Sequence, residues 1–270
     1  MPKEKRNAIL LSGFCRDFES TVFDFKKNLQ NQENVDVFIC FWDQVGNKTL
    51  TKHPDIVKSN GDELVIKNYS RETIDLERIQ QVYQPSDIRI FNLDQINELI
   101  APFSDIIEKS DMNMKGLKFS YHISRTMLMF YMIGKTYELM AEYGERNNIE
   151  YKNIIRARTD FVQGGYYPKV DWSRDLSSSL VEVGAWNWSG HGVYQINDHF
   201  AFGNKKAMGV YCSFFKNIVT SIEEIKTNSY GSTIFENDQP IATKAWSPEH
   251  MLSIYLSKMG MKWKRVQEIR

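Results

Sequence analysis

The segment Tyr151–Gly165, YKNIIRARTDFVQGG, decides the fold and raises the question of function. Its β-branched and apolar residues predict a buried strand, yet two arginines and an aspartate lie within it. Because side chains alternate along a strand, Arg156, Arg158 and Asp160 are expected to point to one face. Buried guanidinium groups are costly unless an anion meets them. The segment therefore predicts an anion site at the end of a central strand.

The N-terminal residues predict a βαβ unit. NAILLSG is a short apolar run that ends at Gly13, as expected for a buried strand of a parallel sheet. VDVFICFW is a second apolar strand, which ends just before Asp43. The segment between them has apolar residues at helical spacing. The stripe consists of Phe18, Val22, Phe25 and Leu29.

The middle of the chain continues the alternation of helices and strands. Residues 47–68 are polar and predict a surface excursion. Ser70 is a suitable N-cap for a helix that runs to about Tyr83, and DIRIF is a third short strand. The longest helical pattern covers Ser120 to about Tyr143, and its methionine-rich stripe predicts core packing. This helix leads directly into the strand that carries the arginines.

The C-terminal part has a different composition. Residues 164–203 are rich in glycine and aromatic residues and predict loops and short strands. Two helices follow, one from Lys205 to about Ile225 and one in SPEHMLSIYLSKMG. Ser247, Pro248 and Gly260 suit the N-cap, first and C′ positions of the last helix.

Composition excludes several classes of protein. Lys+Arg and Asp+Glu number 34 each among 270 residues, so the net charge is zero and a nucleic-acid-binding face is not expected. Three scattered cysteines predict neither a disulfide framework nor a zinc site, and favour a reducing compartment. Because no signal peptide or transmembrane segment is evident, we expect a cytoplasmic protein, with peripheral membrane contact left open.

Candidate ligand-binding residues follow the predicted parallel strands. Ligands of open α/β sheets bind at the carboxyl ends of the strands, where charged and small residues gather in this sequence. Arginines suit phosphate oxygens, and an aspartate suits Mg²⁺ or Mn²⁺. Motifs for a P-loop, a dinucleotide fold and a zinc protease are absent. The candidates for cofactor binding are Ser12, Gly13, Arg16, Asp43, Arg125, Arg156 and Arg158, and the candidate metal ligand is Asp160.

An ordered set of motifs resembles the GT-A-type glycosyltransferases. The set comprises ILLSGFCR, VDVFICFWD, YKNIIRARTDF, NDHFAFGNKKAM and SPEHMLSIYL. It is most similar to the WavE-like lipopolysaccharide and capsule group, in which R-x-R-x-D stands in place of D-x-D. A D-x-F-x-F-G element and a P-E element follow in that group. Their counterparts here are Asp198, Phe200, Phe202, Gly203, Pro248 and Glu249.

The resemblance implies one GT-A-like α/β domain over residues 1–270, with a mixed sheet flanked by helices. Residues 8–163 would form the half that binds the nucleotide-sugar donor, a UDP- or GDP-sugar, and residues 164–265 the half that binds a glycan acceptor. A divalent metal would bind at Asp160. Asp198 and Glu249 are the candidate catalytic carboxylates of an inverting transfer, in which one of them accepts the acceptor's proton. The aromatic residues that would stack on sugar rings are Tyr166, Tyr167, Trp172, Trp186, Trp188 and Tyr194.

Other interpretations remain open at this stage. The same layout fits an α/β enzyme that uses S-adenosylmethionine, such as a methyltransferase. It also fits a non-catalytic carbohydrate-binding or scaffold module. Asp160 could form a structural ion pair with either arginine, and Glu249 could stabilise the dipole of its own helix.

Overall fold

The structure is a computed structural model. It describes residues 2–16, 18–32, 34–45, 55–58, 64–67, 72–95, 98–99, 101, 123–159, 167–187, 194–218, 234–236, 239–241 and 248–266.

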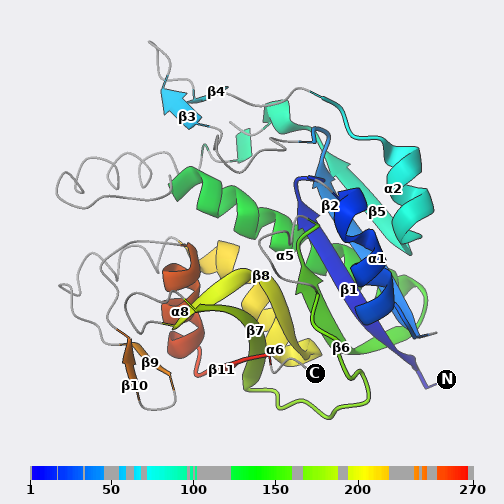
Figure 1. The fold of residues 1–270 in the computed structure, drawn as a ribbon, viewed down its shortest axis with the longest axis vertical. Coiled ribbons are helices and arrows are strands. Elements are labelled where there is room, and N and C mark those ends of the chain that lie inside the picture. Colours follow the sequence, from blue (N-terminus) through cyan, green and yellow to red (C-terminus); the bar gives the residue numbers. More distant parts are fainter. Residues whose placement is uncertain are drawn as a thin grey trace.

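One seven-stranded sheet runs through the middle of the described part (Figure 1), in the order β11-β7-β8-β6-β1-β2-β5. Every neighbouring pair is parallel except the two pairs that involve β8, so the sheet is mixed. The strands are β1 (Glu4–Gly13), β2 (Val35–Trp42), β5 (Asp87–Phe91), β6 (Ile149–Ala157), β7 (Leu180–Asn187), β8 (Tyr194–Asn204) and β11 (Lys262–Arg265).

The strand order reverses at β1. From β1 the chain adds β2 and then β5 on one side, and it returns to place β6 on the other side of β1. In open α/β sheets this point of reversal, the topological switch point, leaves a crevice at the carboxyl ends of the two strands. Here the switch point lies between β1 and β6.

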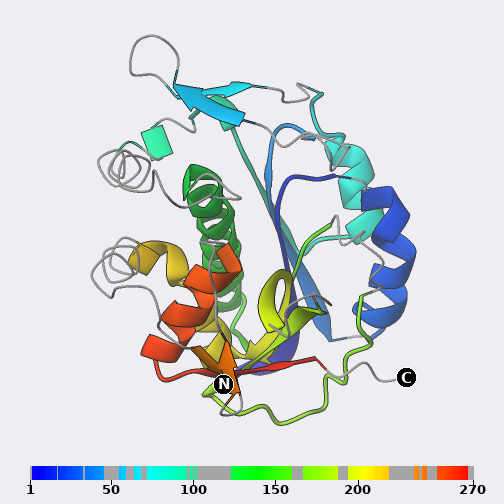
Figure 2. The same ribbon diagram turned by 60° about the vertical axis from the view of Figure 1, so that its left-hand side comes forward.

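Helices cover both faces of the sheet (Figure 2). On one face, α1 (Phe18–Asn28) and α2 (Leu76–Tyr83) pack on Ile9, Ile39 and Ile155. On the other face, α5 (Ile123–Arg146), α6 (Lys205–Cys212) and α8 (Pro248–Lys258) pack on residues that include Leu10 and Ile154. Each strand of the central part is therefore buried on both faces, which explains its continuous apolar sequence.

Two helices point their N-termini toward the carboxyl ends of the parallel strands. After α5 the chain turns through residues 147–148 into the amino end of β6, where the amide of Glu4 donates to the carbonyl of Asn148. α8 likewise ends just before the amino end of β11. Because both helices run antiparallel to the strands that follow them, their first turns lie on the carboxyl-end side of the sheet.

The sequence predicted most of this framework. The structure confirms the α/β class, the βαβ start, DIRIF as a strand and the long helix before β6. It also confirms the helix from Pro248, after which Gly260 has a left-handed conformation (φ 68°). The arrangement is consistent with the GT-A-like fold that the resemblance implies. The division into donor and acceptor halves stays a prediction, and one sheet runs through both.

Residues 47–68 contain a hairpin, β3 (Asp55–Lys58) and β4 (Leu64–Lys67), separate from the main sheet. Three expectations were wrong in detail. α2 begins after Asp75, whose carboxylate accepts from the amide of Arg78, and not at Ser70. Residues 164–203 contain the long strands β7 and β8 in place of short ones. The helix that begins at Lys205 has its first break at Ser213, after which residues 214–218 are helical again.

Smaller elements complete the described part. A 3₁₀ helix, η1 (Leu93–Gln95), follows β5, and β9 (Ile234–Glu236) pairs with β10 (Gln239–Ile241). Among the described helices, none combines the length and the apolar character that a membrane crossing needs.

Candidate functional site

Strand register brings three chain segments together at the switch point. Gly13 pairs with Phe41 on β2, and Leu11 pairs with Ala157 on β6. Ser12 therefore lies level with Arg158, the first residue after β6. The loops that follow β1, β2 and β6 meet at one edge, as the sequence predicted.

Hydrogen bonds of Thr159 join these loops. Its hydroxyl donates to the carbonyl of Phe14 at 3.0 Å, and its carbonyl accepts from the hydroxyl of Thr21 on α1 at 2.7 Å. Thr159 is 1% exposed; its bond to Thr21 is buried, and its bond to Phe14 is partly buried. The loop after β6 is thereby fixed to the loop after β1.

The backbone of Arg158 is held on both sides. Its amide donates to the carbonyl of His199 on β8 at 3.1 Å, and its carbonyl accepts from the hydroxyl of Tyr167. β6 ends at Ala157, just before Arg158, and Asp160 lies outside the described residues, so the expectation that both share one strand face with Arg156 stays a prediction. Arg158 is half-buried at the sheet edge.

The loop after β1 supplies a glycine and a cation. Gly13 has φ 108°, a conformation that side-chain-bearing residues rarely adopt, although a Cβ there would meet nothing within 4 Å. Conformation rather than lack of space therefore favours glycine. The half-buried guanidinium of Arg16 lies 5.2 Å from the centroid of the Phe14 ring. Contact of both residues with a ligand at the switch point stays a prediction.

Asp43 has a structural role that the sequence did not reveal. One of its carboxylate oxygens accepts from the amide of Leu93 at 3.0 Å, which anchors the turn η1 after β5. A carboxylate can accept further hydrogen bonds. The role of Asp43 in binding a ribose or a base stays a prediction.

Two buried polar side chains on one face of the sheet lack hydrogen-bond partners among the described residues. Arg156 is 1% exposed, and its Nε and Nη1 atoms have none; Ser12 is 5% exposed, and its hydroxyl has none. Arg156 pairs with Leu10 in the register, and Leu10 and Ser12 are two residues apart on β1, so both side chains are on the same face. Polar groups so deeply buried are normally satisfied, so the position of this pair near the switch point needs a physical reason.

The thiol of Cys212, at the end of α6, lies within electrostatic range of Arg156. Burial raises the pKa of Cys212 well above its ordinary value, and the nearby Arg156 charge offsets part of this shift. All three cysteines are buried, and none is in a disulfide. Arg156 thus lies in the interior, under α6, and not among solvated groups.

Several predicted site residues are only partly placed. Asp160 lies outside the described residues. Arg125 and Glu249 belong to the first turns of α5 and α8, on the carboxyl-end side of the sheet, and Asp198 is in β8 next to His199. The side chains of these three are not among those described, so their proposed roles stay predictions.

Two aromatic residues expected to bind sugar are core residues. Tyr167 and Trp172 are each 2% exposed and pack in the cluster beneath α1. The indole nitrogen of Trp172 donates to the carbonyl of Leu29 at 3.1 Å. The expectation that they offer free ring faces to a sugar was wrong. Tyr166 and Trp188 are outside the described part, as are the side chains of Trp186 and Tyr194.

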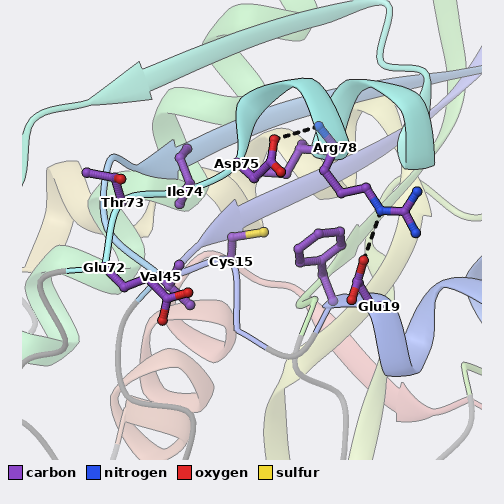
Figure 3. A pocket seen from close by; sticks show the side chains of 10 residues that line it. Cys15, Glu19, Val45, Glu72, Thr73, Ile74, Asp75 and Arg78 are labelled. Carbon is purple, nitrogen blue, oxygen red and sulfur yellow. Dashed lines mark hydrogen bonds and ion pairs between the residues drawn. The ribbon is translucent and has the colours of Figure 1, made fainter.

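A cavity of about 420 Å³ adjoins the carboxyl ends of β1 and β2. Figure 3 shows Cys15 between the segment 72–75 and Glu19, and shows Arg78 reaching from α2 to Glu19 on α1, where Nε lies 2.9 Å from the carboxylate. The sequence did not predict this cavity, because its walls come from segments far apart in the chain. The lining residues are Cys15, Phe18, Glu19, Val45, Glu72, Thr73, Ile74, Asp75, Arg78 and Ile79.

The described residues offer no ready-made metal centre. No group of three or more His, Cys, Asp or Glu side chains in this part of the chain is arranged to hold a metal ion. The predicted ligand, Asp160, lies outside it, so the metal stays a prediction.

Fold and site together define a mixed-sheet α/β protein with a candidate ligand site at the carboxyl-end switch point. No family model matches the chain, and no curated protein matches it. Among solved structures, the glycosyltransferase GlyE of Streptococcus pneumoniae TIGR4 aligns with 97% of this chain and 46% of that chain, at a TM-score of 0.35 and 10% identity. The likeness is weak, and the chain spans about half the length of that structure.

Proposed function

We propose that the protein is a glycosyltransferase that moves a sugar from a nucleoside-diphosphate sugar to a glycan acceptor. One observation carries the proposal: Arg16 and Arg158 follow the two strands that flank the switch point, and Cys15, which precedes Arg16, lines a cavity of about 420 Å³. That volume lies within the range of small-molecule pockets. Guanidinium groups are suited to phosphate oxygens, so a diphosphate fits between the arginines and a nucleoside fits the cavity. The motif resemblance points to the same activity.

The proposed reaction is an inverting transfer. The hydroxyl oxygen of the acceptor attacks the anomeric carbon, and the bond from that carbon to the diphosphate oxygen breaks. The hydroxyl proton passes to Asp198 or Glu249, and the nucleoside diphosphate leaves with the negative charge. Arg158 and Arg16 would stabilise that charge as it develops. Asp160 is the proposed ligand of a divalent metal, which would supply further positive charge at the diphosphate.

An enzyme that uses S-adenosylmethionine is the runner-up. Its cofactor has no phosphate, so it would make no use of the two arginines at the switch point. A carbohydrate-binding module would likewise need no catalytic carboxylates. Both alternatives predict ligand responses that differ from those of a glycosyltransferase.

A ligand screen tests the proposal. The melting temperature would be measured with UDP, GDP, CDP, dTDP and S-adenosylmethionine, each with and without Mn²⁺, because a ligand of the native state raises it. At least one diphosphate should stabilise the protein. Arg158→Ala should weaken its binding by about 1.5–3 kcal/mol, the range for charged hydrogen bonds. Arg146→Ala, at the opposite edge of the sheet, is the matched control and should bind normally.

Other results would support the runner-up or refute part of the proposal. Stabilisation by S-adenosylmethionine alone would support the runner-up. No response to any diphosphate, or unchanged affinity in a folded Arg158→Ala variant, would refute the donor site. A product that retains the donor's anomeric configuration, seen by proton NMR, would refute the inverting mechanism.

A further inference from the structure

Two buried side chains near the switch point offer hydrogen-bond donors that the described part of the protein does not use. Nε and Nη1 of Arg156 and the hydroxyl of Ser12 have no hydrogen-bond partner among the described residues. Their exposed fractions, 1% and 5%, leave them little contact with bulk water. A guanidinium only donates, and a hydroxyl can donate as well. The pair is therefore suited to an acceptor that comes from outside the chain.

The sheet brings the two side chains within reach of a single ligand. Arg156 on β6 pairs with Leu10 on β1, and Ser12 is two residues further along β1 on the same face. The spacing between strands and the rise along a strand put their Cα atoms roughly 8 Å apart. Diagonal neighbours on a sheet at such a separation are within reach of long side chains such as arginine. One atom between the two side chains can accept from both.

The described residues around Arg156 supply no counter-charge. Its neighbours in the register are apolar, Leu10 on β1 and Ala201 on β8. Cys40, which pairs with the serine, has a thiol that is neutral near pH 7, because burial raises its pKa to about 12. Burial also raises the pKa of the Cys212 thiol, which lies near the guanidinium and is neutral as well. A positive charge among such groups is costly to bury unless an anion meets it.

Charge and size narrow the class of anion. One guanidinium balances one negative charge, so a monovalent anion is sufficient. The donors are shielded from solvent, so an entering ion has to displace side chains, and a monatomic ion requires the smallest displacement. α6 covers this face of the sheet and contributes Met208, whose flexible thioether side chain can adapt.

A halide also fits the chemistry of the donors. It accepts hydrogen bonds from any direction and has no hydrogen of its own, so it leaves no new polar group unsatisfied. A water molecule would leave the positive charge uncompensated and would need acceptors for its own two hydrogens.

We propose that Arg156 and Ser12 bind one chloride ion in the layer between the sheet and α6. The site is separate from the cavity to which the nucleoside is assigned, because neither residue lines that cavity. It does not depend on the proposed function, since a protein of any activity has to compensate this buried charge. The ion stabilises the folded chain, because only the folded chain brings the two side chains together.

Thermal melts in which chloride replaces gluconate at constant ionic strength test the site. Gluconate is far larger than chloride, so the exchange changes the ion that can enter and keeps general screening constant. A ligand of the native state raises the melting temperature as its concentration increases. Chloride at about ten times its dissociation constant should raise the melting temperature of the wild type by about 2 °C or more.

Variants locate the ion. Arg156→Met should lose the response to chloride, and Ser12→Ala should weaken chloride binding several-fold by removing one donor. Without halide Arg156→Met should melt above the wild type, and added chloride should narrow the difference. Arg158→Met, the same substitution two residues away at the edge of the sheet, is the matched control and should keep the full response. An unresponsive wild type, or a full response in Arg156→Met, would overturn the site.

Bromide provides a direct measurement on the wild type, which also decides the matter if Arg156→Met does not fold. Crystals of the full chain grown in bromide should give an anomalous diffraction peak within hydrogen-bonding distance of both Arg156 and Ser12. Peaks at the sheet edge alone, or no peak, would overturn the site. Loss of the chloride response in Arg158→Met with retention in Ser12→Ala would likewise move the anion to the edge and overturn it.

Discussion

Replacing Arg156 by methionine should stabilise the folded protein. Its guanidinium is 1% exposed, and two of its nitrogen atoms have no hydrogen-bond partner among the described residues. An unsatisfied buried donor costs about 1–3 kcal/mol, and replacing buried charges by apolar groups often stabilises a protein by about 1–4 kcal/mol. The shorter methionine leaves some empty volume, at about 24 cal/mol per Å³. We expect a net gain of about 1–2 kcal/mol, or roughly 2–8 °C in melting temperature.

Urea denaturation measures this effect. The midpoint should rise in Arg156→Met with an unchanged slope, since the exposed area on unfolding hardly changes. Arg156→Lys keeps the charge on a more strongly hydrated group and should be less stable than the wild type. Arg146→Met is the surface control; it breaks the exposed ion pair of Arg146 with Asp87 and should shift stability by less than about 1 kcal/mol. A loss of more than 1 kcal/mol in Arg156→Met would refute the reasoning, because it would mean that the native protein satisfies this guanidinium.

Three further substitutions test one ion pair of the sheet and two residues of the loops at the site. Burial alone would raise the pKa of Glu182, but hydrogen bonds and charges from Arg174 and Lys264 outweigh burial and lower this pKa. The ionised carboxylate therefore contributes stability above about pH 4.5, and this contribution is lost as the pH falls further. The melting temperature of Glu182→Gln should accordingly depend less on pH in the acid range than that of the wild type. Gly13→Ala should lower stability by about 1–3 kcal/mol through backbone strain, and a melting temperature equal to that of the wild type would contradict this. Thr159→Val should cost about 0.5–1.5 kcal/mol by removing the hydrogen bond to the carbonyl of the half-buried Phe14, and should speed amide hydrogen exchange in the loop after β1.

Apolar periodicity predicted the strands and helices that are placed by burial of their apolar residues. The runs before Gly13 and Asp43 and the stripe of Phe25 and Leu29 are apolar because both faces of the sheet are covered. Capping signals were less decisive, because Ser70 and Asp75 both suit an N-cap and only packing selects between them. The helix begins after Asp75, the later of the two residues, because Ile79, Val82 and Tyr83 are buried against the rest of the protein.

The candidate site was predicted in part for a similar reason. The rule that parallel strands end at one edge predicted the meeting of the loops after β1, β2 and β6, without knowledge of side chains. Aromatic composition did not distinguish a core residue from a sugar platform, so the burial of Tyr167 and Trp172 was missed. The cavity was missed as well, because Glu19 and Glu72 come together only when α1 and the segment before α2 pack at the end of the sheet.

The two arginines of the R-x-R element differ in burial because β6 ends between them. Arg156 is inside the strand and its charge is shielded from solvent, whereas Arg158 is the first residue beyond it and is half-buried. In a medium of low dielectric constant the field of Arg156 extends further than that of a solvated group, and it reaches the edge two residues away. An anion bound at Arg158 would therefore also relieve part of the cost of burying Arg156. It follows that a diphosphate should stabilise the wild type more than Arg156→Met, even though Arg156→Met is the more stable protein without ligand. Equal stabilisation of both proteins would show that the buried charge and the ligand site are independent.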